Sequence, residues 1–292
     1  MVGRAAGSTR KASQDSMAVE NSPRKASSAT AGGGALLGSV DADAMRAEIT
    51  RIGYAIAPNV VGPAVLDRLR NFWLAEYAKP CPVAPMVWGP YLGEANGALF
   101  DEAPTHCLYR SFDYLWNSPC DALTRQVAIA LNRVRNRIIG EHEHYGEMMD
   151  AERYGIYVTT SYYPCGSGWM HMHQDMYDDR RHWHYILPLT FRGEQYAAGG
   201  LTLIDREGGR VDVEERLPAG AVLFYDGALM HGVERIEGAE GLRTGRLQMF
   251  AIPIFFELPR DSQRHAADLS TRLFVRAKLS RLKRRMVRGM TR

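Results

Sequence analysis

The sequence has few cysteines and no long hydrophobic run. Its 292 residues include four cysteines, none of which forms a CxxC pair. This argues against a disulfide framework and against a zinc ribbon. No apolar stretch is as long as a membrane span, and the first residues lack the apolar core of a secretory signal. Because scattered thiols suit a reducing compartment, we expect a soluble, cytoplasmic protein.

The charge is small overall and unevenly distributed. The net charge is +3, but residues 260–292 carry eleven Lys and Arg against two Asp and Glu, whereas residues 41–259 carry 20 against 29. An acidic body with basic ends does not suit a protein built around a phosphate backbone, so we do not expect a nucleic-acid partner. For the basic end we favour a helix that packs an apolar stripe on the body. Contact with an acidic surface or membrane is the alternative.

Apolar spacing divides the rest of the chain. Residues 1–40 are rich in Ser, Gly and Ala without a hydrophobic period, which predicts a disordered tail. Helical spacing predicts helices over 41–52, 62–77 and 120–140, the last ending at Gly140. Between the last two, the many Pro, Gly and aromatic residues of 80–120 predict an irregular segment that covers part of the fold.

From residue 153 the pattern changes to short segments rich in β-branched and aromatic residues, separated by Gly, Pro and Asp. Seven such segments, from RYGIYVTTSYY to GRLQMFAIPIFFE, predict an antiparallel sandwich or jelly-roll barrel. We therefore expect a mainly β protein with flanking helices. Its domain spans 41–259, with a double-stranded β-helix (jelly-roll) core at about 153–257, helical support before it and a basic C-terminal helix at 260–292.

The segment WMHMHQD, residues 169–175, is typical of a metal site. A His and an acid two residues apart on one strand point the same way, as His173 and Asp175 do here. Two His and one carboxylate form the facial triad of non-haem Fe(II) oxygenases, and His231 in LMHGVER follows another predicted strand. Arg246 stands on the next strand, where its planar fork can bind a carboxylate.

This order of HxD, a distal His and an Arg, inside jelly-roll strands, resembles the Fe(II)/2-oxoglutarate-dependent dioxygenases. YPCGSGWMHMHQD is similar to the prolyl hydroxylase approach to the metal, and ITRIGYAIAPNVVGPAVLDRLRNFW is similar to the start of phytanoyl-CoA dioxygenase-like enzymes. The resemblance covers roughly 45–257. It implies that His173, Asp175 and His231 bind iron, that Arg246 binds the distal carboxylate of 2-oxoglutarate, and that Tyr163 reaches this co-substrate. Arg243 competes with Arg246, although it lies in the turn GLRTG.

The resemblance also implies the chemistry. Fe(II), 2-oxoglutarate and O2, with ascorbate as a further allowed cofactor, would hydroxylate a C–H bond of a small organic substrate and release succinate and CO2. Related halogenases have a small residue in place of the acid, which leaves room for chloride. Because Asp175 fills that place, we expect hydroxylation or another oxidation that uses no halide. The enzyme would be a monomer or dimer, with its substrate chosen by loops at 80–120 and 176–184.

Two alternatives remain, and three further histidines have weaker predictions. A cupin-type metal dioxygenase without 2-oxoglutarate would use the HxH pair of His171 and His173, but the Glu that usually follows is missing. A catalytically silent jelly-roll binding module is the other alternative. We expect His171 to lie near the metal without binding it. His182 and His184 are predicted to lie on an edge strand or in a loop.

Overall fold

A computed structural model describes residues 36–83, 96–147, 156–177, 180–181 and 183–254. The predicted disordered tail falls almost wholly outside these residues, and the predicted basic helix at 260–292 falls entirely outside them. None of the helices in the described part of the chain is long and apolar enough to cross a membrane.

Three helices and thirteen strands are found among the described residues. The helices are α1 (Ala42–Ile52), α2 (Pro63–Tyr77) and α3 (Ala122–Ile139), and the strands are β1 (Tyr54–Ala57), β2 (Gly97–Ala103), β3 (His106–Tyr114), β4 (Ile156–Tyr163), β5 (Trp169–His173), β6 (Met176–Tyr177), β7 (Arg180–Arg181), β8 (Trp183–Pro188), β9 (Ala198–Ile204), β10 (Arg210–Asp212), β11 (Val222–Asp226), β12 (His231–Glu237) and β13 (Arg246–Ile254). The three predicted helices are therefore confirmed, and α3 is followed by Gly140 as expected.

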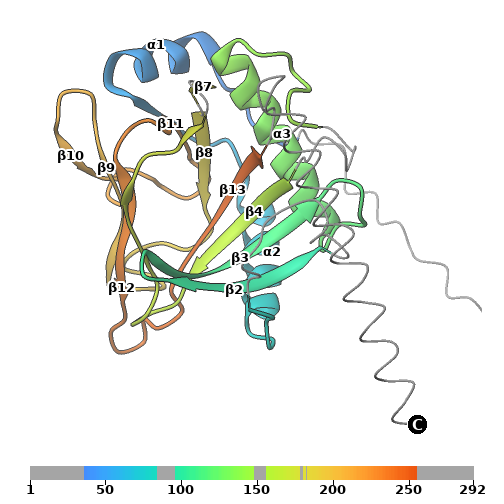
Figure 1. Ribbon diagram of the computed structural model, residues 1–292, viewed down its shortest axis with the longest axis vertical. Coiled ribbons are helices and arrows are strands. Elements are labelled where there is room, and N and C mark those ends of the chain that lie inside the picture. The colour runs from blue at the N-terminus through green and yellow to red at the C-terminus, as the bar shows by residue number, and fades with distance from the viewer. Residues whose placement is uncertain (1–35, 84–95, 148–155, 178–179, 182, 255–292) are drawn as a thin grey trace, which may run out of the picture. The chain divides into compact units, whose positions relative to one another are not determined.

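The strands form a curled antiparallel sheet. Within the described residues eleven strands pair in the order β1-β11-β8-β13-β4-β3-β5-β12-β9-β10, with β2 joined to β3 beside this path. In Figure 1, β9, β10 and β12 lie on one side of the interior, and β3, β4 and β13 lie on the other. Because one sheet folds over itself in this way, the mainly β prediction with a jelly-roll core and flanking helices is confirmed.

The helices begin and end at residues suited to those positions. The side chain of Asp41 accepts hydrogen bonds from the backbone N–H groups of Asp43 and Ala44 before α1, and Pro63 opens α2. Gly140 adopts a φ of 79° after α3, a left-handed conformation that glycine adopts without strain. These local signals agree with the helix bounds that apolar spacing predicted.

The helices cover the outer face of the sheet. Leu69 and Trp73 of α2 and Leu131 of α3 pack in one buried cluster with Tyr185 and Leu187 of β8. Alternate residues along a strand face opposite sides, so the intervening Ile186 packs in a second cluster between the two layers. The helices thus hold one wall of the barrel, and its inner face is left to carry the site.

One prediction about the fold is wrong. Residues 80–120 were expected to be irregular, but β2 and β3 form a long hairpin with seven register pairs, from Gly97 opposite Phe112 to Ala103 opposite His106. The Pro and Gly residues gather at 80–97, outside most of this hairpin. Averaging over the whole segment hid the aromatic and β-forming residues of β3, which pair with both β4 and β5.

Candidate metal centre

The three predicted metal ligands lie together at one end of the barrel. His173 ends β5, Asp175 follows it, and His231 begins β12; one ligand atom from each lies within 4.8 Å of the others. His173 and His231 are direct partners in the register of these two strands. The backbone N–H of Asp175 donates to the carbonyl of Gly227 at 2.8 Å. The turn before β12 therefore fixes the place of the carboxylate.

Both histidines present the same ring nitrogen to the centre. Nδ1 of His173 lies 2.9 Å from the carbonyl oxygen of His171, and Nδ1 of His231 lies 2.8 Å from that of Leu229. A carbonyl only accepts, so each Nδ1 carries a proton, and Nε2 is the nitrogen whose lone pair is free when the ring is neutral. In both cases the acceptor lies two residues earlier in the chain, which orients the imidazole as a metal ligand requires.

The charges around Asp175 favour its ionised form. Burial raises the pKa of this carboxyl, but the contacts with His184 and His231 lower it by more than burial raises it. The pKa of Asp175 therefore lies well below the ordinary value. Burial lowers the pKa of His173, and the neighbouring His231 adds to this effect. A carboxylate and a neutral imidazole are the protonation states in which these groups bind a metal.

His184 is a residue of the site that the sequence analysis placed wrongly. It was expected in an edge strand or loop, but it lies on β8, between β11 and β13, and is 2% exposed. Its Nε2 is 3.1 Å from Oδ2 of Asp175. His184 lies two residues before Ile186 on the same strand, and alternate residues of one strand face the same side. This spacing is the signal that could have placed His184 inside the barrel. His182 lies outside the described residues.

Arg246 lies in a second buried polar cluster. Its Nε donates to Oε1 of Glu214 at 2.7 Å and its Nη1 donates to Oε1 of Gln248 at 2.5 Å, whereas its Nη2 has no hydrogen-bond partner in the described part of the chain. Burial lowers the pKa of Arg246, but Glu214 raises it above the ordinary value, so the guanidinium remains charged. The competing Arg243 is exposed in the turn before β13.

Glu214 is itself held from two sides. It accepts a hydrogen bond from the Tyr196 hydroxyl at 2.5 Å and another from the backbone N–H of Leu201 at 2.9 Å. A Cβ on Gly200 would lie 2.3 Å from Cγ of Glu214, so only glycine leaves room for this side chain. The sequence analysis missed Glu214, because VDVEER contains two adjacent glutamates and nothing in it shows which one faces Arg246.

A pocket of about 300 Å³ opens between the layers and is lined by all three predicted metal ligands together with Tyr163 and Gln248. Tyr163 lies opposite Arg246 in the register of β4 and β13, and the Arg246 guanidinium carbon is 6.0 Å from its ring centroid. Burial raises the pKa of Tyr163, so the phenol stays neutral. The structure therefore brings together the metal candidates and, through Tyr163 and Gln248, the neighbourhood of Arg246.

His171 lies at the rim of this pocket. The residue is exposed, its Nδ1 is 3.0 Å from the carbonyl oxygen of Thr105, and its own carbonyl accepts the proton of His173 Nδ1. It therefore acts on His173 through its backbone. Its place next to the predicted ligands agrees with the expectation that it lies near the centre.

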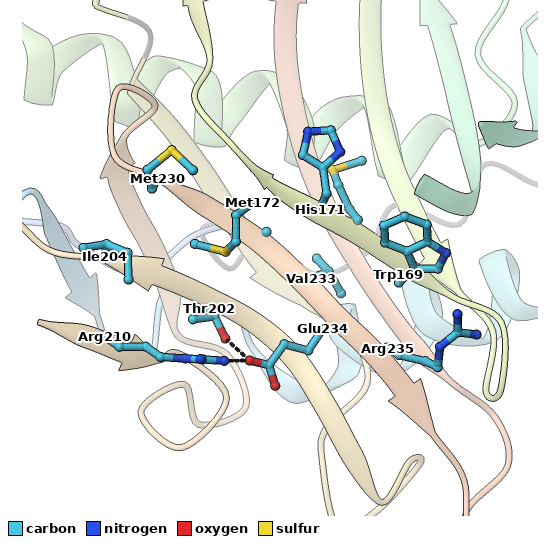
Figure 2. A pocket seen from close by; sticks show the side chains of 12 residues that line it. Trp169, His171, Met172, Thr202, Ile204, Arg210, Met230, Val233, Glu234 and Arg235 are labelled. Carbon is cyan, nitrogen blue, oxygen red and sulfur yellow. Dashed lines mark hydrogen bonds and ion pairs between the residues drawn. The ribbon is translucent and has the colours of Figure 1, made fainter. Parts of the chain in front are cut away.

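A larger groove, of about 590 Å³, lies beside the same strands and shares His171 with the pocket. Figure 2 shows its mainly apolar lining, in which Met172 and Met230 are 36% and 37% exposed. At one side Glu234 forms an ion pair with Arg210 and accepts a hydrogen bond from Thr202. The groove thus extends apolar surface outward from the edge where β5 meets β12.

Comparisons with known proteins give the fold. No protein-family model and no curated protein matches the sequence. Among solved structures, a prolyl-4-hydroxylase from Pseudomonas putida matches with a TM-score of 0.51 at 16% identity, over 73% of this chain and 98% of that one.

Two other solved structures match less closely. A prolyl hydroxylase from Trichoplax adhaerens matches at 12% identity with a TM-score of 0.46, over 77% of this chain and 91% of that one. An oxidoreductase of the 2OG-Fe(II) oxygenase family from Burkholderia pseudomallei matches at 12% identity with a TM-score of 0.42, over 74% and 91%. The chain therefore has the fold of the Pseudomonas putida prolyl-4-hydroxylase, which confirms the jelly-roll fold that the resemblance in the sequence implies.

Proposed function

We propose that this protein is a non-haem Fe(II)- and 2-oxoglutarate-dependent dioxygenase that hydroxylates a C–H bond of a small organic substrate and releases succinate and CO2. The observation that carries the proposal is the arrangement of His173, His231 and Asp175. Two imidazoles, each with Nδ1 next to a backbone carbonyl oxygen, present their Nε2 atoms next to an ionised carboxylate at the wall of the pocket. This donor set is the one that non-haem Fe(II) prefers.

The residues present fit an iron ion. The two Nδ1 protons are already committed to backbone carbonyls, so no rearrangement of the rings is needed before the Nε2 atoms bind. When bound, iron supplies together with 2-oxoglutarate and O2 the oxidising power for the hydroxylation. Three protein ligands leave the remaining positions to the co-substrate and oxygen. His173, Asp175 and His231 are therefore the proposed ligands.

Arg246 fits the distal carboxylate of 2-oxoglutarate. Its Nη2 is buried and lacks an acceptor among the described residues, and an unpaired buried donor is unfavourable by about 1–3 kcal/mol. A carboxylate would supply that acceptor with a charge-assisted hydrogen bond. Tyr163, neutral and next to Arg246, is the proposed second contact. The exposed Arg243 offers no comparable buried donor, which favours Arg246.

The remaining pocket walls would orient the substrate and exclude water. Ile186, Val233 and Phe250 are apolar lining residues, and Arg110 provides a charged one whose Nε lies 2.9 Å from Oδ2 of Asp101. A dry wall strengthens the electrostatic contacts inside the pocket. We propose a small-molecule substrate, and that the oxygenase domain spans residues 41–259; the start of α1 at Ala42 supports the first boundary.

The test is succinate release by the full chain. Protein loaded with Fe(II) without oxygen is given 2-oxoglutarate, O2 and a panel of amino acids, lipids and peptides, with and without ascorbate. Succinate that requires both iron and 2-oxoglutarate supports the proposal. Oxygen uptake that requires metal but not 2-oxoglutarate would favour the cupin-type alternative. Absence of metal binding and of turnover would favour a binding module and overturn the proposal.

A further inference from the structure

His184 occupies a place in which a polar side chain needs a reason. It lies on a central strand of the sheet, it is 2% exposed, and its neighbours Trp183 and Tyr185 on β8 are buried as well. Neither ring nitrogen has a partner with hydrogen-bond geometry in the described part of the chain. A buried imidazole without partners is unfavourable, and an apolar residue would fill the same space without this loss.

The contacts of His184 lead to the proposed metal centre. Its Nε2 lies 3.1 Å from Oδ2 of Asp175, closer than the 3.4 Å from Nε2 of His231 to the same oxygen. The other carboxylate oxygen, Oδ1, lies on the side of His173, 3.7 Å from its Nε2. The ring of Tyr225 packs against both His184 and His231, at centroid distances of 5.2 and 5.0 Å. These aromatic rings leave His184 facing Asp175.

We propose that His184 is the positioning residue of Asp175. It donates its Nε2–H to Oδ2 and thereby turns Oδ1 toward the metal, so that the carboxylate binds through one oxygen. This inference rests on the metal site proposed above. A modest rotation of the carboxylate converts the 3.1 Å contact into a hydrogen bond. Without the donor, both oxygens are free to bind the metal, which occupies a position that the co-substrate or O2 needs.

The partners of the imidazole nitrogens argue against His184 as a fourth metal ligand. In His173 and His231, Nδ1 contacts a backbone carbonyl oxygen, which leaves Nε2 as the nitrogen that can bind a metal. His184 has no such acceptor at Nδ1 among the described residues, so none of them holds it in the tautomer that a ligand needs. Its Nε2 faces a carboxylate oxygen, which favours a proton on that nitrogen. The pattern that marks the two ligands is thus missing in the third histidine.

Metal binding without turnover tests the inference. Co(II) is titrated into the metal-free full chain and into the variants His184→Gln, His184→Asn and His184→Leu. Gln keeps an N–H that can reach Asp175, whereas Asn is shorter and Leu has no donor. We expect Co(II) affinity to fall about 10–100-fold in the Leu and Asn variants and to be largely restored in the Gln variant. The visible spectrum of bound Co(II) should change in the same two variants.

The controls separate this inference from the proposed function. Melting temperatures show which variants fold, and if Leu fails to fold, the Gln and Asn pair still decides. Equal Co(II) affinity in all folded variants, with binding lost in Asp175→Ala, would overturn the role of His184 and leave the metal site standing. If the Cu(II) electron spin echo spectrum lost one imidazole in His184→Gln, His184 would be a metal ligand. That result would also overturn its role as a positioning residue. No Co(II) binding by the unaltered chain would overturn the metal site itself.

Discussion

The barrel interior holds two polar clusters that differ in how far their hydrogen bonds are completed. Around Arg246, Glu214 accepts three hydrogen bonds and a single guanidinium nitrogen is left over. Around Asp175, three imidazoles approach one carboxylate, and the Nε2 atoms of His173 and His231 both face Asp175 oxygens. In the first cluster the protein's own groups make the hydrogen bonds, and Nη2 of Arg246 is the donor without a partner among the described residues. In the site proposed above, a bound cation would complete the second cluster.

The strongest test of this difference removes the carboxylate. Asp175→Ala should lower metal affinity and turnover by more than the roughly 100-fold typical of residues that only orient a ligand. Metal titration and succinate release measure both effects, with the exposed Asp43→Ala as the matched control. The hydrogen bonds around Arg246 should be unchanged, because none of them involves Asp175. Unaltered turnover in Asp175→Ala would contradict the assignment.

The second test addresses the open donor. Arg246→Lys keeps the charge but loses the planar fork, so the KM for 2-oxoglutarate should rise about 10–100-fold, since a charge-assisted hydrogen bond contributes about 1.5–3 kcal/mol. Metal affinity should stay the same. Arg243→Ala is the matched control and should leave this KM unchanged. The reverse pattern in steady-state kinetics would assign the co-substrate to Arg243.

The third test weakens the support of Arg246. Glu214→Gln removes the charge that faces the guanidinium, and the loss should lower the free energy of unfolding by about 1–3 kcal/mol. The neighbouring Glu215→Gln is the control, because its side chain is 72% exposed. Thermal unfolding measures stability, and Co(II) titration should detect no change. A parallel loss of metal affinity would show that the two clusters are coupled.

The smallest expected effect is the response of metal-free protein to acid. Burial lowers the pKa values of His173 and His184 from 6.5 in the folded state. The unfolded chain therefore binds protons first, and stability, full above pH 6.5, declines as the pH falls below this value. The low pKa of Asp175 acts only in much stronger acid. We expect the melting temperature to drop by about 3 °C or more between pH 7.5 and 5.5. His184→Gln should reduce this drop in melting temperature. A melting temperature of the unaltered chain that does not change with pH would contradict the prediction.

Strand periodicity is enough to predict much of the candidate site from the sequence. The residues that it does not predict were missed for physical reasons. His173 and Asp175 could be found because two residues two apart share a side of the chain, and Arg246 could be found because it alternates with Gln248 on a clear strand. His184 was misplaced because its burial depends on elements far along the sequence, such as β11, which pairs with it at Tyr225. Glu214 was missed for a similar reason, since its partner Arg246 is 32 residues away.

The register of β5 and β12 has a consequence for the stability of this part of the sheet. His173 and His231 lie opposite each other, and apart from β12 the strand β5 pairs only with β3, at two register positions in the described residues. A metal bound by both imidazoles would cross-link these strands. By mass action, metal at 100 times its Kd would add about 2.7 kcal/mol to the free energy of unfolding. Loss of the metal should therefore speed amide hydrogen exchange first in β5, so that catalytic competence and local order would fail together.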